Sequence, residues 1–452
     1  MYYVIKRFVR ETGWHQSAGP VLKEKVMSTS TKLISHIKLP RFVRVSQYFP
    51  HSELTEQSFD ESLDLQLDMV KERVQPGQRI AITAGSRGID HMPKTLKRLA
   101  AWVRDLGGEP FIIPAMGSHG GATAEGQRAI LAGLGITEET MNCPILSSME
   151  TVHVDTVDGL EVHIDKNAFE ADGIILCNRV KAHTSFQGDF ESGLMKIIAI
   201  GLGKQHGAYT CHAKGDDYMP SRIAAIGKSV IAHSNVLFGV ALLENAFDKT
   251  FELDVVPAEE IETTEPKLLK KAKAAMGRLY FDSCDILIVR AIGKNYTGAG
   301  MDPNVVGRCV NPKLSLGIES QRLGILDLST ESHGNATGMG RADFAPRRFY
   351  EKVSFDDTYP NGITSYNTSA FRVPMIMDND LEVMQACVAS SLDIDYASPR
   401  MIIIDNSLEI GHILISEVMI PQTESIPELT IESDPFELEF DGAGNLLTKI
   451  LD

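Results

Sequence analysis

The sequence predicts an α/β protein, with two α/β domains around a cleft and a Rossmann-like N-terminal domain built on a mostly parallel sheet. The chain has 452 residues, of which 43% are apolar and 23% charged, so it can bury a large core. Apolar runs alternate with amphipathic segments from residue 79 onward, as in βαβ units. The alternation restarts near residue 284 after an acidic, proline-containing stretch, which favours two units over one.

In the first half, each apolar run is followed by a helical pattern. Residues 79–85 predict a buried strand, and the helix expected over 93–108 begins with a proline and ends with two glycines, the usual positions of these residues. The further elements expected here are a strand at 109–117, a helix at 123–135 and a strand at 172–180. Ligands of open parallel sheets bind beyond the carboxyl ends of the strands. The segments after the three strands are therefore expected to face one crevice: Ser86-Arg87, 117–119 and 181–183.

The second half shows the same kind of pattern. Residues 255–266 resemble a connector and 266–279 a solvated helix, so we expect hinge bending near 255–280. Strands are expected at 284–293, 323–329, 373–378 and 401–405. The predicted divisions are a leader of uncertain order at 1–35, an N-terminal cofactor and catalytic domain at 36–270, a C-terminal α/β domain at 271–415, and a tail at 416–452 that packs on either domain, with edge strands or a small hairpin.

Charge and composition exclude several classes of function. Acidic residues outnumber basic ones by 60 to 44, for a net charge of -16, which argues against nucleic acid and anionic membranes as partners. No apolar run reaches the roughly 18 residues of a membrane helix, and the start of the chain lacks a signal-peptide pattern. The six cysteines are scattered without CxxC spacing, as in reduced thiols. We therefore expect a cytoplasmic protein.

The segment 180–215 is the densest in histidine, lysine and glycine. Lys196 lies in the apolar run GLMKIIAIG, where desolvation would lower its pKa and make the amine nucleophilic. A lysine that extends its charged end to the surface would give the same pattern. Both interpretations stay open from the residues alone.

Three other patterns allow more than one interpretation. The glycines at 201, 203 and 207 form GxGxxxG rather than the GxGxxG of dinucleotide-binding turns, so an NAD(P) site is a weak match. A zinc site from His183, His206 and His212 is conceivable, although the spacing fits no zinc signature. The loop 115–127 is either a flexible turn or a place where glycines let the backbone approach an anion.

Residues 79–308, about half the chain, resemble the nickel-pincer-nucleotide-dependent lactate racemases and their homologues, which racemise or epimerise 2-hydroxy acids. The resemblance rests on four landmarks in the family's order: Gly85-Ser86-Arg87, Gly117-Ser118-His119, Lys181-Ala182-His183, and Gly193-Leu-Met-Lys196 followed by His212 after sixteen residues. Between His183 and Lys196 the spacing of thirteen residues is longer than in the lactate enzymes.

The resemblance implies a role for each landmark. His119 and His183 would be the two bases, one for each enantiomer, which suits imidazoles with an ordinary pKa of about 6.5. A nickel-pincer nucleotide (nickel pyridinium-3,5-bisthiocarboxylic acid mononucleotide) would be joined to Lys196 and accept hydride, a task that no side chain performs. His212 would ligate nickel, with His206 as the alternative. Arg87 would bind the substrate carboxylate, and Ser86, Gly117 and Ser118 would border the cofactor, which other proteins would have to synthesise.

The segment 296–308 departs from the lactate enzymes, which place a Gln and a Lys there. Here Gly307 and Val310 take the corresponding positions, with Lys294 and Arg308 nearby. We therefore expect a substrate larger than lactate, such as a dicarboxylic or sugar-derived 2-hydroxy acid, whose added group meets Lys294 or Arg308. The alternatives are an NAD(P)-dependent 2-hydroxy acid dehydrogenase and a non-catalytic protein that binds hydroxy acids.

Overall fold

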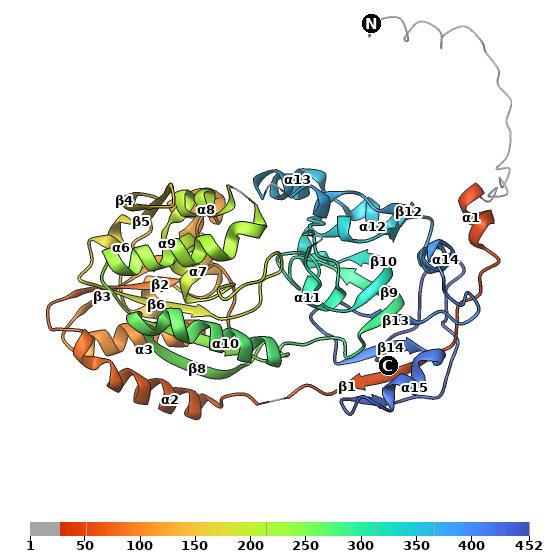
Figure 1. The fold of residues 1–452 in the computed structure, drawn as a ribbon, viewed down its shortest axis with the longest axis horizontal. Helices are drawn as coiled ribbons and strands as arrows, with labels where there is room; N and C mark the ends of the chain where they lie inside the picture. The colour runs from red at the N-terminus through yellow and green to blue at the C-terminus, as the bar shows by residue number, and fades with distance from the viewer. Residues whose placement is uncertain (1–27, 51, 214, 312, 366, 452) are drawn as a thin grey trace, which may run out of the picture.

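The computed structural model describes residues 28–50, 52–213, 215–311, 313–365 and 367–451. Most of the predicted leader, residues 1–27, lies outside these ranges, and Thr29–Ile34 form helix α1. Two α/β units lie side by side, each around its own sheet (Figure 1). The predicted α/β class is confirmed.

The smaller sheet has the strand order β3-β2-β6-β7-β8. Its strands are β2 (Arg79–Ala84), β3 (Glu109–Pro114), β6 (Gly173–Arg179), β7 (Val236–Glu244) and β8 (Thr250–Pro257). The first four pair in parallel and β8 is antiparallel to β7. The strands predicted at 79–85, 109–117 and 172–180 are confirmed. Their carboxyl ends therefore share one edge of the sheet.

Helices cover both faces of this sheet, because successive residues of its buried strands point to opposite sides. Ile80 and Ile82 pack under α2 (Glu56–Met69), α3 (Met92–Asp105) and α4 (Ala124–Gly133). Ala81 faces the other layer. That layer consists of α7 (Leu194–Lys196), the π-helix η4 (Ile197–Leu202), α8 (Lys204–His212), α9 (Met219–His233) and α10 (Ile261–Ala275). The hairpin β4 (Thr151–Val157) and β5 (Leu160–Asp165) lies beside α8 and α9, and the short helices are α5 (Glu138–Met141) and α6 (Lys166–Phe169).

The larger sheet is mixed, with the order β12-β11-β10-β9-β13-β14-β1-β15. Its strands are β1 (Phe42–Gln47), β9 (Ser283–Ile292), β10 (Glu319–Leu328), β11 (Phe344–Pro346), β12 (Met375–Met377), β13 (Met401–Ile404), β14 (His412–Ser416) and β15 (Leu429–Ile431). Its helices are α11 (Pro303–Val306), α12 (Arg347–Lys352), α13 (Phe355–Thr364), α14 (Asp380–Ser390) and α15 (Ile420–Thr423). The four strands predicted in this half are present, and β10 begins four residues earlier than expected.

The first strand does not belong to the sheet that follows it in the chain. Strand β1 pairs antiparallel with β14 and β15 in the larger sheet, whereas the sequence analysis placed it in the unit 36–270. The tail supplies the predicted edge strand as β15, which lies on the larger sheet. The chain therefore passes between the two units once after β1 and again after α10 (Figure 1).

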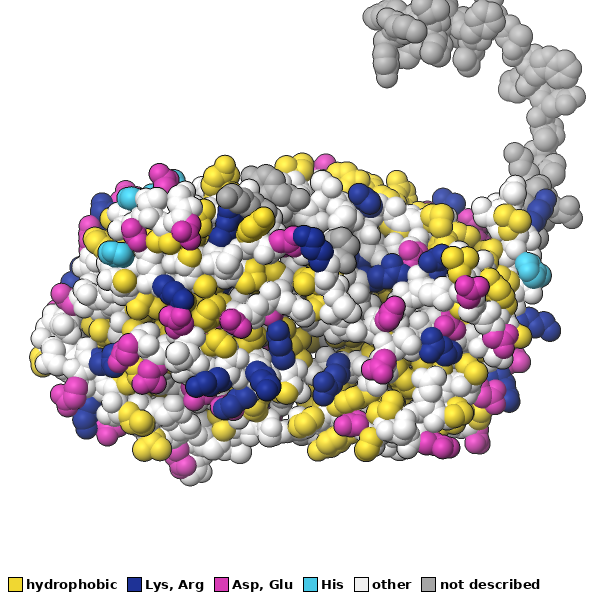
Figure 2. Space-filling view, in the orientation of Figure 1, with side chains coloured by type: hydrophobic (Ala, Val, Ile, Leu, Met, Phe, Trp, Pro, Cys, Tyr) yellow, Lys and Arg dark blue, Asp and Glu magenta, His cyan; other side chains and the backbone are white. Residues whose placement is uncertain are grey.

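The predicted connector at 255–266 is wrong. Residues 255–257 end β8, and α10 begins at Ile261 and continues through Pro266. Ile261 and Glu265 are buried in the small unit, so packing outweighs the helix-breaking tendency of the proline. The predicted solvated face is present, since the exposed lysines of α10 stand on the outer surface (Figure 2). The crossing segment is shorter than predicted and follows Ala275.

Within the described ranges, none of the helices combines the length and apolar character that crossing a bilayer would need.

Candidate active site

The loops after β2 and β3 meet at the carboxyl edge of the smaller sheet. Ser86 Oγ and His119 Nδ1 are hydrogen-bonded at 2.5 Å. Gly117 has φ of +61° and its N–H donates to the carbonyl of Gly201 on η4 at 3.3 Å. A Cβ on Gly117 would lie 3.1 Å from Ile200 Cγ2, so glycine lets this loop lie against the helix.

The side chain of His119 is exposed. Loss of hydration there nevertheless lowers the pKa of its imidazole to about 4, and the positive charges of Arg87, Lys196 and Lys294 act in the same direction. The ring is therefore neutral at pH 7. Ser118 beside it is exposed.

His183 follows β6 and is held from several sides. Its ring stacks on Phe186 at a centroid distance of 3.9 Å, and its backbone N–H donates to Glu191 at 2.7 Å. Burial lowers the pKa of His183 well below its ordinary value, with Lys196 and His212 adding to the effect. The backbone N–H of Ser185 donates to His183 Nδ1 at 3.1 Å. Because Nδ1 accepts, the proton of the neutral ring must be on Nε2.

Lys196 ends the short helix α7, and its charge acts on the rings of both His119 and His183. Burial lowers the pKa of its ammonium to about 8, and the charge of Arg87 adds to this. Its Nζ lies 5.8 Å from the ring centroid of Phe186, and no ion pair or hydrogen bond joins it to another described residue. The partly desolvated, reactive lysine considered from the sequence is therefore the interpretation that the geometry favours.

Two buried glutamates hold the segments that carry these groups. Glu191 accepts the backbone N–H groups of His183 and Gly188 and pairs with Lys273 at 2.5 Å. Glu265 accepts the N–H of Met195 at 2.8 Å, at the first turn of α7. Sequence analysis missed both, because an acidic residue on a charged helix or loop gives no sign of being buried.

The two candidate nickel ligands face different directions on α8. His206 stacks on His163 of β5 at 4.6 Å, on the outer side of the layer. His212 is half-buried, and burial followed by the charge of Lys196 lowers the pKa of its ring. Six residues along an α-helix turn the side chain by about 120°, which explains the difference. His212 therefore lies with the site and His206 does not.

Two of the alternative sites fail on this geometry. The zinc site is wrong because His206 faces away from His183 and His212, and the described residues contain no group of three ligating side chains suited to a metal. Gly201 lies in η4, Gly207 lies in α8 and Gly203 joins the two helices, so none of the three is in a strand-to-helix turn. A Cβ on Gly201 would lie 2.6 Å from the Ala115 carbonyl, so this glycine serves helix packing and not a dinucleotide.

The larger unit supplies the opposite wall of the cleft. Lys294 follows β9 and donates to Asn361 Oδ1 at 2.8 Å. Burial lowers its pKa, with a contribution from the charge of Arg87. Arg87 faces Gly298, since a Cβ there would lie 2.7 Å from the guanidinium Nη2. No carboxylate of the described residues pairs with either cation, so the two would suit an anionic ligand.

Arg308 does not lie in this wall. Its guanidinium pairs with Asp343 at 3.0 Å and donates to the carbonyls of Ser320 and Gln321, at the start of β10. Lys294 follows the carboxyl end of β9, which pairs in parallel with β10, so these partners hold the Arg308 guanidinium at the opposite end of the two strands from Lys294. Gly307 is also structural: it ends α11 with φ of +74°, and a Cβ would lie 1.7 Å from the Ile318 carbonyl. Arg308 is thus engaged by Asp343 and two backbone carbonyls, and Gly307 is required by the turn, so neither residue supports the expectation of a larger substrate.

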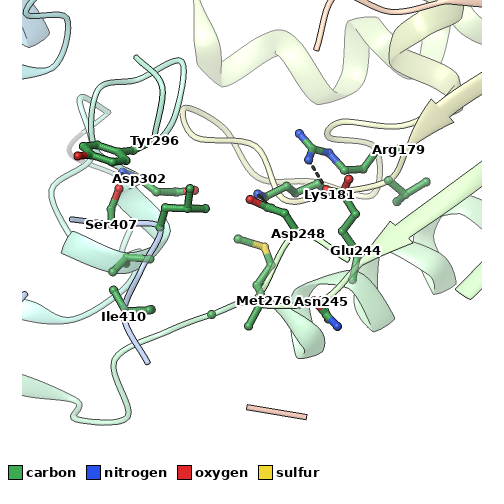
Figure 3. Close-up of a pocket in the computed structure, with 16 residues that line it drawn as sticks. Arg179, Lys181, Glu244, Asn245, Asp248, Met276, Tyr296, Asp302, Ser407 and Ile410 are labelled. Atoms are coloured by element: carbon green, nitrogen blue, oxygen red, sulfur yellow. Dashed lines mark hydrogen bonds and ion pairs between the residues drawn. The ribbon is translucent and has the colours of Figure 1, made fainter. Parts of the chain in front are cut away.

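Two cavities lie between the units. One of about 40 Å³ is shown in Figure 3, where Arg179 and Lys181 face Tyr296 and Asp302 across the gap. Its cations have acidic neighbours, since Arg179 pairs with Glu244 and Lys181 lies 3.8 Å from Asp248. The other has about 360 Å³ and polar walls: His212, Gly215, Asp216, Asp217, Val310, Asn311, Ser365, Asn367, Thr368 and Ser369. The larger cavity is lined by His212 but not by His119, His183 or Lys196.

Comparison with known proteins adds a family match and a structural likeness. Residues 82–255, which include all the landmarks of the smaller unit, match the family model described as a domain of unknown function, DUF362. No curated protein matches the chain. Among solved structures, the chain is similar to the lactate racemase apoprotein from Thermoanaerobacterium thermosaccharolyticum, with 12% identity and a TM-score of 0.45 over 86% of this chain and 97% of that one.

Proposed function

We propose that this protein is a racemase or epimerase of a 2-hydroxy acid larger than lactate, and that it works with a nickel-pincer nucleotide attached to Lys196. The observation that carries the proposal is that His119 and His183 both lie close enough to Lys196 for its charge to act on their rings. Two neutral imidazoles and an unpaired amine therefore meet beside cations that lack carboxylate partners. This is a set of groups for moving protons on an anionic ligand.

The residues present fit the cofactor. Lys196 offers an amine without an ion-pair partner among the described residues, and a pKa near 8 leaves about a tenth of it unprotonated at pH 7, far more than for an ordinary lysine. His212 lies close enough to Lys196 for the charges to interact, and a single imidazole is the one protein ligand that this cofactor requires. When bound, the group would supply a hydride acceptor, which the side chains lack.

The chain's own residues would handle the substrate's proton and charge. Arg87 would bind the carboxylate, because it is a desolvated cation without a carboxylate partner among the described residues. His119 is neutral at pH 7 and can accept the hydroxyl proton, while the hydroxyl of Ser86 either donates to or accepts from its Nδ1. His183 presents Nε2–H, since Ser185 occupies its Nδ1, and would donate a hydrogen bond to the substrate from the other side.

The larger cavity supports a substrate longer than lactate. Its amide and hydroxyl groups, including Asn311, Asn367 and Thr368, are suited to the hydroxyls of a sugar-derived acid. Val310, which takes the place of a polar residue in the lactate enzymes, lines this cavity. Lys294 remains the residue proposed to meet an added acidic group.

The test begins with the covalent link. The protein is produced together with the enzymes that synthesise the cofactor, and intact mass spectrometry with peptide mapping locates the adduct. We expect it on Lys196, absent from Lys196→Ala and present in Lys228→Ala, a control at an exposed lysine of α9. Loaded protein is then incubated with single enantiomers of lactate, malate and gluconate, followed by chiral chromatography.

Two results would overturn the proposal. An adduct-free protein that isomerises none of these acids would remove the racemase function. Fast isomerisation of lactate alone would remove the larger substrate.

A further inference from the structure

A buried lysine lies directly beneath the candidate site. The Lys204 side chain is fully buried, and its backbone has φ of +51°, in the left-handed region that favours glycine. A lysine at such a position needs partners for its charge, because burying an unpaired ammonium is costly. Lys204 stands at the start of α8, between Lys196 and His212 in the chain.

All the partners of Lys204 belong to other elements. Its Nζ lies 3.0 Å from Asp165 Oδ2 at the end of β5, and donates to the Pro114 carbonyl at 2.5 Å and to Gln127 Oε1 at 3.2 Å. Asp165 and Gln127 are fully buried as well. Burial lowers the pKa of Lys204 and raises that of Asp165, while each charge opposes this effect on the other. Three buried polar side chains thus form one connected group.

This group extends to the loop that carries His119. The amide nitrogen of Gln127 donates to the carbonyl of Gly117 at 2.8 Å and to that of His119 at 3.3 Å. Lys204 fixes the orientation of this amide, since a flipped Gln127 would turn its NH₂ group toward the ammonium. The Gln127 amide nitrogen therefore donates to both loop carbonyls only while Lys204 donates to the amide oxygen.

The same lysine is attached to the other half of the site. It comes one residue after the end of η4, the helix continuous with Lys196, and η4 contacts the His119 loop through the hydrogen bond between Gly117 and Gly201. Through the Pro114 carbonyl, Lys204 also holds the end of β3, from which that loop departs. Lys204 thus links the segment of Lys196 to the segment of His119.

We propose that Lys204 is a positioning residue: with Asp165 and Gln127 it holds the His119 loop against the helix that carries Lys196 and so sets the spacing of the two groups. The inference deepens the proposed function, on which it rests, and concerns how this chain builds the site. A buried ion pair is by itself weak evidence for a stabilising role, and this one is connected at both ends to residues of the site.

The test measures His119 directly. The protein is labelled with ¹⁵N-histidine, and the ring resonances are followed by NMR between pH 3.5 and 8, with His119 assigned from the spectrum of His119→Asn. Lys204→Met/Asp165→Asn removes one positive and one negative charge, so the net charge is unchanged. Gln127→Met releases the loop carbonyls without any change in charge, and serves if the double variant does not fold.

A matched control comes from the larger unit. Arg348 and the buried Asp380 form an ion pair of 2.5 Å there, and Arg348→Met/Asp380→Asn removes it with the same charge balance. Urea unfolding of every variant shows how much stability each has lost. If a general loss of stability changed the titration midpoint of His119, this control would show the same change.

We expect the His119 midpoint to move from about 4 by about one pH unit or more toward the ordinary value near 6.5 in the Lys204 and Gln127 variants. The freed ring gains water and moves away from Lys196 and Arg87. The control is expected to keep the wild-type midpoint. An unchanged midpoint in the variants that fold would overturn the proposal, as would an equal change in the control. This readout needs neither cofactor nor substrate, so failure of the racemase function would leave it unaffected.

Discussion

Glu265 is the buried carboxyl at the start of the Lys196 helix, and replacing it should change how stability depends on pH. The residue is 1% exposed, and burial raises the pKa of its carboxyl from 4.5 to about 7. Only the N–H groups of Leu194 and Met195 act in the opposite direction. A difference of about 2.5 pH units corresponds to roughly 3 kcal/mol, at about 1.4 kcal/mol per unit.

The sign follows from proton linkage. The folded protein holds this proton more tightly than the unfolded chain, so the stabilisation is complete below pH 4.5 and is lost as the pH rises through about 7. Glu265→Gln cannot titrate. The free energy of unfolding of the variant, relative to wild type, should therefore increase by up to roughly 3 kcal/mol between pH 5 and pH 8. Burying the amide NH₂ group of the variant costs the same free energy at every pH. This cost therefore does not alter the change in relative stability between pH 5 and pH 8.

The assay is urea unfolding followed by tryptophan fluorescence at pH 5, 6.5 and 8. The chain has two tryptophans, and a Trp14→Phe background leaves Trp102, which is buried in α3 of the same unit as Glu265. Glu262→Gln, at an exposed position of α10, is the matched control and should follow the wild-type pH dependence. Parallel curves for wild type and Glu265→Gln would refute the reasoning.

Three further substitutions test the packing of the site. Gly201→Ala should cost about 1–3 kcal/mol in urea unfolding, since the new Cβ would lie 2.6 Å from the Ala115 carbonyl; wild-type stability would contradict this close approach. Gly298→Ala should displace the Arg87 guanidinium, which lies 2.7 Å from the added Cβ, and weaken binding of hydroxy acids in calorimetry while stability stays within about 0.5 kcal/mol; unchanged affinity would argue against a binding role for that arginine. Arg308→Met should lose about 1–2 kcal/mol of stability and bind ligand as wild type does. A loss of affinity without a loss of stability would show instead that Arg308 binds the substrate.

The sequence predicted the part of the site that depends on local order. Glycine-rich turns after apolar strands placed Arg87, His119 and His183 at one sheet edge, because the carboxyl ends of parallel strands share an edge whatever the rest of the fold does. Lys196 was also found, because a lysine within an apolar run is unusual in itself. These features depend on neighbours a few residues away.

The residues that were missed or misplaced depend on distant partners. Arg308 looked available in the sequence, yet Asp343, the residue just before β11, forms an ion pair with it. Lys204 followed a glycine string and gave no sign of its partner Asp165, 39 positions earlier. The sequence could not decide between His206 and His212 as the candidate ligand, because that depends on the direction in which α8 points each ring.

The amino-acid sequence by itself determined the α/β class, the strands of the smaller sheet and the loops that follow them, because periodicity and turn chemistry are local properties. Only the tertiary structure decided that β1 pairs with β14 and not with the strands that follow it in the chain. The two strands are about 370 positions apart, so their pairing depends on which sheet edges are open and not on the local sequence. It also decided which cations have no carboxylate as an ion-pair partner among the described residues. Charge pairing depends on distances in space, and those are settled only when the two units face each other.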